Sequence, residues 1–309
     1  MLNIVGQALE ELGLAAPGAP LRYYINITAG ESLAISVFAE DGRFFQVKAS
    51  EFLDLASQYA TYCRAWADYP SFVPRPLGYR QLEGWSLMVT EGRHHVAVRP
   101  ERLLDVAASG PDSAAHQLLG YFRANAGHAG PSASEGGHAG ALAMLAAYFA
   151  PTPLARTAAA VLQSAGALGV EALPDMPQHG DFTLNNLAWS SGRLVIFDWE
   201  DFRRVRLPGF DLFALCFTVL EQHDFAMRGL MQGRRHRRLD PLLERACAAQ
   251  GLAPERFRRL VPLYLLSFLH LKRNYGAELQ QRLADMLVAL TEPAAAVPAA
   301  LPPYSAALR

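Results

Sequence analysis

The sequence places an aspartate and an asparagine five residues apart and adds a second aspartate after an apolar run. The segment His179-Gly180-Asp181 leads to Asn186, and Asp198 lies further along the chain. In enzymes that transfer phosphoryl groups, a loop with this Asp-to-Asn spacing uses its carboxylate to accept the proton of the attacking hydroxyl. Its amide binds a metal ion. The spacing therefore favours phosphoryl-transfer chemistry, with Asp181 acting on the acceptor hydroxyl.

A predicted hairpin brings the second acid to the same place. Leu187–Trp189 and Leu194–Phe197 flank Ser190–Gly192, whose residue types are typical of a turn. Antiparallel pairing across this turn places Asn186 beside Asp198. Because Mg²⁺ prefers oxygen ligands, these two residues are predicted to bind it. The alternative is that they only end the flanking strands, which is an ordinary role for Asp and Asn.

Lysine is rare in this chain, which has two lysines and 26 arginines. One of them, Lys48, ends the strand-like run 43–48. An arginine fork and a lysine point charge are not equivalent on a phosphate, so a retained lysine is a candidate for a specific phosphate contact. The alternative is that Lys48 is retained by chance.

The elements that must position these residues fall into two groups. Strand-like runs cover residues 23–27, 33–38, 44–48, 77–79 and 85–89. Asp41-Gly42 is a hairpin turn signal, and apolar residues three and four apart predict a helix over 50–67. Residues 1–91 are therefore predicted to form a small N-terminal lobe built on an antiparallel sheet with one helix.

From residue 92 onward the pattern becomes mainly helical. Helices are predicted over residues 106–124, 141–149, 154–164, 212–222, 240–250, 254–276 and 278–290. The stretch 127–140 is rich in Gly, Ala and Ser and is predicted to be a surface connection. Residues 92–292 form the predicted larger lobe, and the proline-rich tail 293–309 is predicted to lack fixed structure.

Composition excludes several other classes of protein. A net charge of −1 over 309 residues gives no basic surface for nucleic acid. No stretch approaches the ~20 strongly apolar residues of a membrane-spanning helix, and the first twenty residues do not resemble a signal peptide. Cys63, Cys216 and Cys247 show neither metal nor disulfide spacing. We therefore expect a cytoplasmic protein with reduced thiols, and the oligomeric state stays open.

The order of these motifs resembles the aminoglycoside phosphotransferase and choline kinase-like superfamily, small-molecule relatives of the protein kinases. The most specific parts are the His-Gly-Asp-x4-Asn motif, the run Ile196–Glu200, and Asp211 within Pro208–Leu212. Trp-Glu follows Asp198 where protein kinases have Phe-Gly, which disfavours that branch. The resemblance covers about residues 20 to 280 and implies an α+β, bilobal protein-kinase-like fold.

The resemblance also implies how the nucleotide is held. Lys48 would contact the α and β phosphates, and Asn186 and Asp198 would hold Mg²⁺ against them. The loop around Gly30 and Ser32 has a single glycine but can still offer backbone N–H groups to a phosphate. The base would bind at the hinge near Glu91. ATP is the expected nucleotide, with GTP as an open alternative.

Other residues acquire supporting roles from the same resemblance. His179 would brace the catalytic loop, and Asp211 would tie that loop to the next helix. Glu200 would either contact substrate or metal, or order the loop. The family further implies a glutamate on the helix after Lys48, where this sequence has Gln58. Two acids one and two turns earlier, Glu51 and Asp54, could substitute for it.

The acceptor is the least constrained part of the prediction. Between Arg228 and Arg259 there are nine arginines and three acids, centred on residues 234–238. If this segment faces the acceptor, it would repel a polyamine and favour a neutral or anionic hydroxylated metabolite, such as a sugar. A solvated helix face is the alternative. An aminoglycoside-resistance enzyme and a catalytically weak, nucleotide-binding pseudokinase stay open as other functions.

Overall fold

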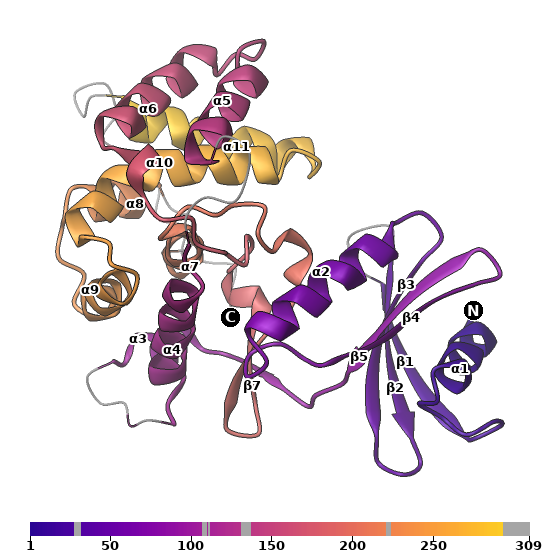
Figure 1. Ribbon diagram of the computed structural model, residues 1–309. Helices are drawn as coiled ribbons and strands as arrows, with labels where there is room; N and C mark the ends of the chain where they lie inside the picture. The colour runs from indigo at the N-terminus through magenta and orange to yellow at the C-terminus, as the bar shows by residue number, and fades with distance from the viewer. Residues whose placement is uncertain (28–31, 107–109, 111, 131–136, 221–223, 293–309) are drawn as a thin grey trace.

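The computed structural model describes the chain except at residues 28–31, 107–109, 111, 131–136, 221–223 and 293–309. The predicted loop residue Gly30 and the proline-rich tail therefore lie outside the described residues. Figure 1 shows a five-stranded sheet at one end of the molecule and a larger group of helices at the other. The predicted α+β class is confirmed.

The N-terminal sheet is antiparallel throughout, with strand order β1-β2-β3-β5-β4. Its strands are β1 (Leu21–Ile27), β2 (Leu33–Ala39), β3 (Phe44–Ser50), β4 (Pro76–Leu82) and β5 (Trp85–Glu91). The predicted turn at Asp41-Gly42 joins β2 to β3, with Phe38 paired with Phe44. Gly42 has a φ of 84°, which glycine adopts without steric cost.

The two faces of this sheet have different neighbours. Helix α1 (Leu2–Glu11) covers one face, where Val47 and Ala49 of β3 are buried. Because successive side chains of a strand point to opposite faces, Lys48 points to the other face. That face is where α2 (Leu55–Asp68) contacts β4 and β5.

Helix α2 packs against both the N-terminal sheet and the helical part of the chain. Asp54 caps its first turn by accepting a hydrogen bond from the Ser57 N–H at 3.1 Å. Its buried residues Leu55, Tyr62 and Ala65 join the larger hydrophobic core, which is built mainly from the C-terminal helices. The predicted division of the chain at residue 91 stays a prediction, and α2 packs across it.

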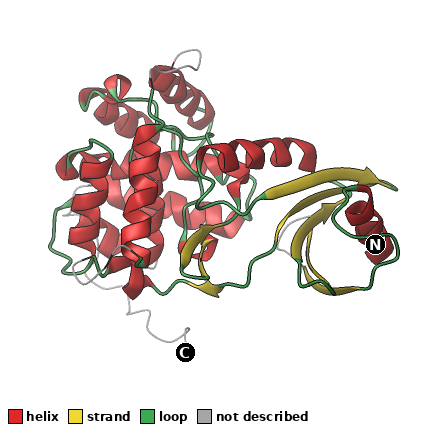
Figure 2. Cartoon of the chain, turned by 60° about the horizontal axis from the view of Figure 1, so that its bottom comes forward, coloured by secondary structure: helices red, strands yellow, loops and turns green. Residues whose placement is uncertain are grey.

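The C-terminal part is mainly helical and carries a three-stranded sheet at its edge. Its helices are α3 (Pro100–Leu104), α4 (Ala114–Gly127), α5 (Gly137–Phe149), α6 (Ala155–Ala167), α7 (Phe210–Val219), α8 (Asp224–Met231), α9 (Leu239–Ala249), α10 (Pro254–Leu271) and α11 (Ala277–Thr291). Its strands are β6 (Val96–Ala97), β7 (Leu187–Ser190) and β8 (Arg193–Ile196). Figure 2 shows the β7–β8 hairpin between the helices and the five-stranded sheet.

Helix α10 is the centre of the helical part. It contacts α5, α6, α7, α8, α9 and α11, and apolar side chains along its length are buried. The helix ends at Leu271, earlier than the prediction of 276, so Lys272 stands at its C-cap. Within the described ranges, no helix has both the length and the apolar character needed to cross a membrane.

Candidate active site

The hairpin that ends in Asp198 forms in the predicted register. Leu187 pairs with Ile196 and Ser190 with Arg193. The turn residues Ser191 and Gly192 have φ values of 49° and 79°, and two successive positive φ values match the twist of the flanking strands. The Phe197 N–H donates to the Asn186 carbonyl at 2.9 Å, which extends the pairing by one residue. Asn186 and Asp198 are therefore brought together, within one residue of register.

Asp211, near the start of α7, holds the predicted catalytic loop in place through hydrogen bonds. Its carboxylate accepts hydrogen bonds from the His179 N–H at 2.7 Å and the Gly180 N–H at 3.1 Å. The Tyr121 hydroxyl on α4 donates to it at 2.7 Å. Burial raises the pKa of Asp211, while His179 and these donors act in the opposite direction. The carboxylate thus links the loop to both α4 and α7.

His179 is fully buried and uses both ring nitrogens on the backbone. Its Nδ1 accepts from the Asp181 N–H at 3.1 Å, so the proton lies on Nε2, which donates to the Phe197 carbonyl at 2.8 Å. The ring packs edge-on against Trp199, with centroids 4.6 Å apart. His179 therefore ties the catalytic loop to the end of the hairpin and has no ring nitrogen left for a substrate.

Asp181 has one carboxylate oxygen engaged by two donors. The Asn186 Nδ2 donates to Oδ2 at 3.1 Å and to the Asp181 carbonyl at 2.8 Å. The Lys272 Nζ lies 3.2 Å from the same Oδ2. No hydrogen bond or ion pair involves Oδ1 within the described part of the chain. Oδ1 is thus the oxygen that can meet an acceptor hydroxyl.

Lys272 was missed by reasoning from the sequence. The side chain is 4% exposed and its Nζ also pairs with Asp201 Oδ2 at 3.1 Å. Burial lowers the pKa of Lys272, but Asp181 and Asp201 outweigh burial and raise it. The available signal was the scarcity of lysine, since Lys48 and Lys272 are the two lysines of the chain.

The carboxylate partner of Lys48 lies in the C-terminal part of the chain. Its Nζ lies 2.9 Å from Glu200 Oε2, and the two side chains are 24% and 30% exposed. Glu200 belongs to the 3₁₀ helix η3 (Trp199–Asp201), which directly follows Asp198. Lys48 therefore spans from β3 to the segment that carries the predicted metal ligand.

The predicted partners of Lys48 on the following helix were wrong. Asp54 is used to cap α2, and Glu51 is exposed. Gln58 occupies the expected helix position, but its Oε1 is buried without a hydrogen-bond partner among the described residues. The reason is geometric, because the Lys48 side chain extends toward η3 and meets Glu200 there.

Asp198 has a left-handed backbone conformation and a carboxylate close to other charged groups. Its φ and ψ are both 60°, in the left-handed region that Asp adopts more readily than most residues. Desolvation and the neighbouring Glu200 raise the pKa of Asp198 to about 6, while Lys48 opposes this shift. A carboxylate held against other carboxylates suits a divalent cation, whose charge would offset their repulsion.

The donors at this point fit Mg²⁺ of the kind found with nucleotides. The Asn186 amide nitrogen is engaged by Asp181, which leaves the amide oxygen for a cation beside the Asp198 carboxylate. No group of three or more His, Cys, Asp or Glu side chains suited to a metal occurs in the described ranges. Mg²⁺ at nucleotide sites needs only one or two carboxylates, with phosphates and water completing its shell.

Some backbone groups of the predicted base-binding region are already used in hydrogen bonds within the protein. The Glu91 N–H donates to the Arg75 carbonyl at 2.8 Å, and the Gly92 N–H donates to the Phe44 carbonyl at 2.8 Å. The Glu91 carboxylate pairs with Arg93 at 3.1 Å. The Glu91 N–H is therefore used within the protein, and a base contact by Glu91 stays a prediction. Ser32 in the predicted phosphate loop is buried.

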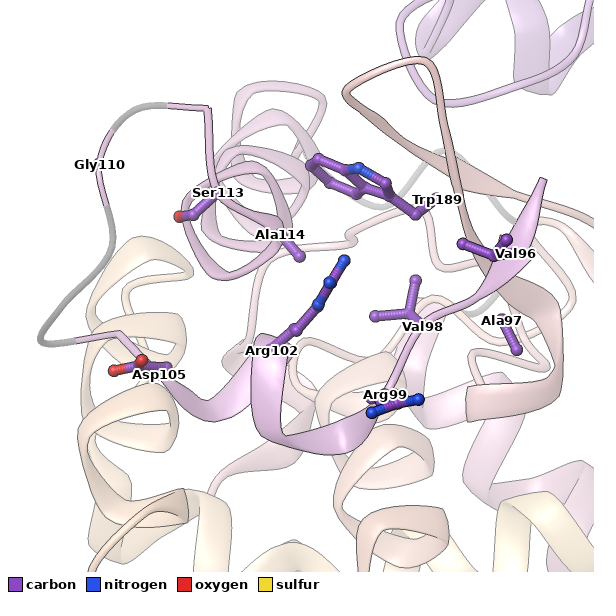
Figure 3. A pocket seen from close by; sticks show the side chains of 10 residues that line it. All are labelled: Val96, Ala97, Val98, Arg99, Arg102, Asp105, Gly110, Ser113, Ala114 and Trp189. Carbon is purple, nitrogen blue, oxygen red and sulfur yellow. The ribbon is translucent and has the colours of Figure 1, made fainter. Parts of the chain in front are cut away.

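A cavity of about 640 Å³ lies near the turn end of the hairpin. Figure 3 shows Arg102 and Trp189 pointing into it, with Val98 and Ser113 on its wall. The lining includes none of the predicted catalytic, nucleotide or metal residues. Asn186 and Asp198 lie at the other end of the two strands, away from the turn.

The arginine-rich segment does not face this site. Residues 234–238 are exposed and connect α8 to α9. Figure 1 shows these two helices at the far side of the helical part from β3 and α2. The charge of this segment therefore gives no information about the acceptor, and the solvated surface is the better interpretation.

Solved structures of small-molecule kinases have the same fold. A candidate fructosamine-3-kinase from Thermobifida fusca matches with a TM-score of 0.58 and 19% identity, covering 93% of this chain and 98% of that one. Aminoglycoside phosphotransferase APH(4)-Ia, in complex with ADP and hygromycin B, matches with a TM-score of 0.56 and 15% identity, covering 93% and 99%. A choline/ethanolamine kinase family protein from Mesorhizobium loti matches with a TM-score of 0.51 and 17% identity, covering 93% of this chain and 99% of that one.

These neighbours confirm the protein-kinase-like fold. No curated protein matches the sequence. The model of the phosphotransferase enzyme family matches residues 46–245, which is well over half of the chain and includes Lys48, Asp181, Asn186 and Asp198. The chain therefore belongs to the phosphotransferase enzyme family.

Proposed function

We propose that this phosphotransferase is an Mg²⁺-dependent kinase that transfers the γ-phosphoryl group of ATP to a hydroxyl of a sugar-like or other hydroxylated metabolite. The observation that carries the proposal is that the fold brings Lys48, Asp181, Asn186 and Asp198 into one region. Lys48 comes from the sheet and the others from the catalytic loop and hairpin. Lys48 pairs with Glu200, two residues after Asp198, and Asn186 donates a hydrogen bond to Asp181.

Each residue has a role that its geometry supports. Asp181 Oδ1 would orient the acceptor hydroxyl and take its proton as the new O–P bond forms and the bond to ADP breaks. Lys48 would exchange part of its contact with Glu200 for the nucleotide phosphates. Asn186 and Asp198 would hold Mg²⁺, which neutralises charge on the β and γ phosphates. Such a reaction depends mainly on positioning and charge, which these fixed side chains supply.

ATP is the proposed nucleotide, with GTP as the alternative. The similar aminoglycoside phosphotransferase was solved with ADP, which supports an adenine nucleotide on this fold. We also propose a cytoplasmic location, where this nucleotide is available.

The proposed acceptor is a neutral or anionic hydroxylated compound that binds beside Tyr275. Tyr275 is 49% exposed, and its ring lies 4.9 Å from the Lys272 Nζ. Burial raises the pKa of Tyr275, Lys272 lowers it, and Asp181, Glu200 and Asp198 raise it further. An exposed aromatic ring at this position offers an apolar face on which a sugar ring can pack.

The test is ATP consumption with Mg²⁺ across a panel of sugars, amino alcohols and aminoglycosides, with Asp181→Asn as the control. The proposal expects acceptor-dependent ADP release with a sugar-like compound, and its loss in Asp181→Asn. Efficient phosphorylation of a kanamycin-like compound alone would favour an antibiotic-resistance enzyme. Tight ATP binding without transfer to any acceptor would favour the pseudokinase.

A further inference from the structure

Lys272 sits where a buried cation meets the proposed catalytic carboxylate. It stands at the C-cap of α10, far in sequence from the catalytic loop. Its Nζ lies 3.2 Å from Asp181 Oδ2 and 3.1 Å from Asp201 Oδ2, and the aromatic rings of Phe268 and Tyr275 lie over it at 5.7 and 4.9 Å. A lysine with 4% exposure must be matched by opposite charge, and two carboxylates supply that charge.

Asp201 anchors this lysine independently of Asp181. It belongs to η3, its side chain is 10% exposed, and it also pairs with the Arg204 Nη1 at 3.3 Å. The backbone of Asp201 packs directly on the catalytic loop, since a Cβ built on Gly180 would lie 2.7 Å from the Asp201 carbonyl oxygen. The Lys272 ammonium is therefore held by a second carboxylate besides that of Asp181.

The two donors on Asp181 Oδ2 define how that carboxylate is turned. Asn186 Nδ2 and Lys272 Nζ approach the same oxygen at 3.1 and 3.2 Å. A carboxylate with one oxygen held by an amide and a charged amine resists rotation about its last bond. Its other oxygen, Oδ1, is then held in one orientation.

We propose that Lys272, anchored by Asp201, is a positioning residue that holds Asp181 so that Oδ1 faces the acceptor hydroxyl. The proposal rests on the proposed function, because it assigns Lys272 a part in the same transfer. Lys272 acts through Asp181 and does not touch the phosphates. Its loss is therefore expected to lower turnover and to spare nucleotide binding.

The experiment compares four variants in steady-state transfer and in calorimetric titration with MgATP. Lys272→Met removes the cation, and Lys272→Arg keeps it. The double variant Lys272→Met/Asp201→Met removes the buried pair together, because replacing both partners by apolar groups preserves folding better than removing one. Arg273→Met is the matched control, since this neighbouring cation is exposed and donates only to the His270 carbonyl in the described structure.

The expected result is a split between turnover and binding. Lys272→Met and the double variant should lower kcat about 100-fold, the scale of a misplaced catalytic group, with the Kd for MgATP within about threefold of the wild type. Lys272→Arg should recover at least a tenth of the wild-type kcat, and Arg273→Met should keep kcat within about threefold.

Two outcomes overturn the proposal. One is a folded double variant whose kcat stays within about threefold of the wild type, and the other is a loss of MgATP affinity equal to the loss of kcat. Failure of the proposed function has a different signature. In that case the wild type itself shows no acceptor-dependent transfer that Asp181→Asn removes.

Discussion

Replacing Asp211 with asparagine tests whether this carboxylate fixes the catalytic loop. Three donors point at it, namely the N–H groups of His179 and Gly180 and the hydroxyl of Tyr121, at 2.7, 3.1 and 2.7 Å. Asparagine has nearly the same shape, but it offers one oxygen and one amino group. If its oxygen takes the place of Oδ2, two donors stay satisfied and the amino group faces the Gly180 N–H.

The magnitude follows from counting these contacts. Two hydrogen bonds lose the extra strength of a charged acceptor, about 1 kcal/mol each, and one buried N–H loses its partner, which costs about 1–3 kcal/mol. The gross loss is therefore about 3–5 kcal/mol. Burial raises the pKa of Asp211, so removing its charge also relieves desolvation. We expect a net loss of about 2 kcal/mol in the free energy of unfolding.

The assay is urea unfolding at neutral pH, followed by tryptophan fluorescence. Trp199 is fully buried against His179 and reports on this region. A matched variant, Tyr121→Phe, removes a single donor and should cost about 1.5–3 kcal/mol, as for a bond to a charged group. The double variant should cost less than the sum, because both single changes alter the same Tyr–Asp bond.

The reasoning fails if Asp211→Asn unfolds within about 0.5 kcal/mol of the wild type, the range of ordinary surface changes. It also fails if the two single changes add without coupling. Either result would mean that the loop is held by packing and that the carboxylate is only a buried acid beside it.

Three further predictions concern the reaction. Asp181→Asn should lower transfer about 10²–10⁴-fold, the usual contribution of a general base, while MgATP binding measured by calorimetry stays within about threefold; retention of a tenth of the activity contradicts the assignment. Asp198→Ala should abolish Mg²⁺-dependent ATP binding, and Asn186→Ala should weaken it less, because an amide oxygen attracts a divalent ion less than a carboxylate does; equal effects would count against the metal role. Glu200→Gln should weaken MgATP binding about three- to tenfold, because Lys48 loses the charged partner that orients it; tighter binding would show that Glu200 instead repels the phosphates.

Local patterns in the sequence were sufficient to predict the hairpin and the approach of the two predicted metal ligands. Two apolar runs on either side of a Ser-Ser-Gly turn fix a register over a dozen residues, so the approach of Asn186 and Asp198 could be worked out without a structure. The same holds for the Asp41-Gly42 hairpin, which sets the register of β3 and hence of Lys48.

Contacts between distant segments could not be predicted in this way. Lys48 pairs with Glu200 across the two lobes, and Lys272 reaches Asp181 from the end of α10. The residues of each pair are far apart in the sequence, and no motif links them. Both contacts depend on how the helices pack against one another and against the sheet. Family resemblance misled here as well, because it pointed to an acid on α2 where Gln58 stands.

The packing of α2 has a consequence for how parts of the molecule open. Its buried side chains Leu55, Tyr62 and Ala65 lie in the core formed mainly by the C-terminal helices, whereas most buried apolar residues of the sheet cluster with α1. Cooperative opening follows shared cores and not chain order. The amide hydrogens of α2 should therefore exchange together with those of the C-terminal helices, and the strands on either side of it should form a separate unit with α1.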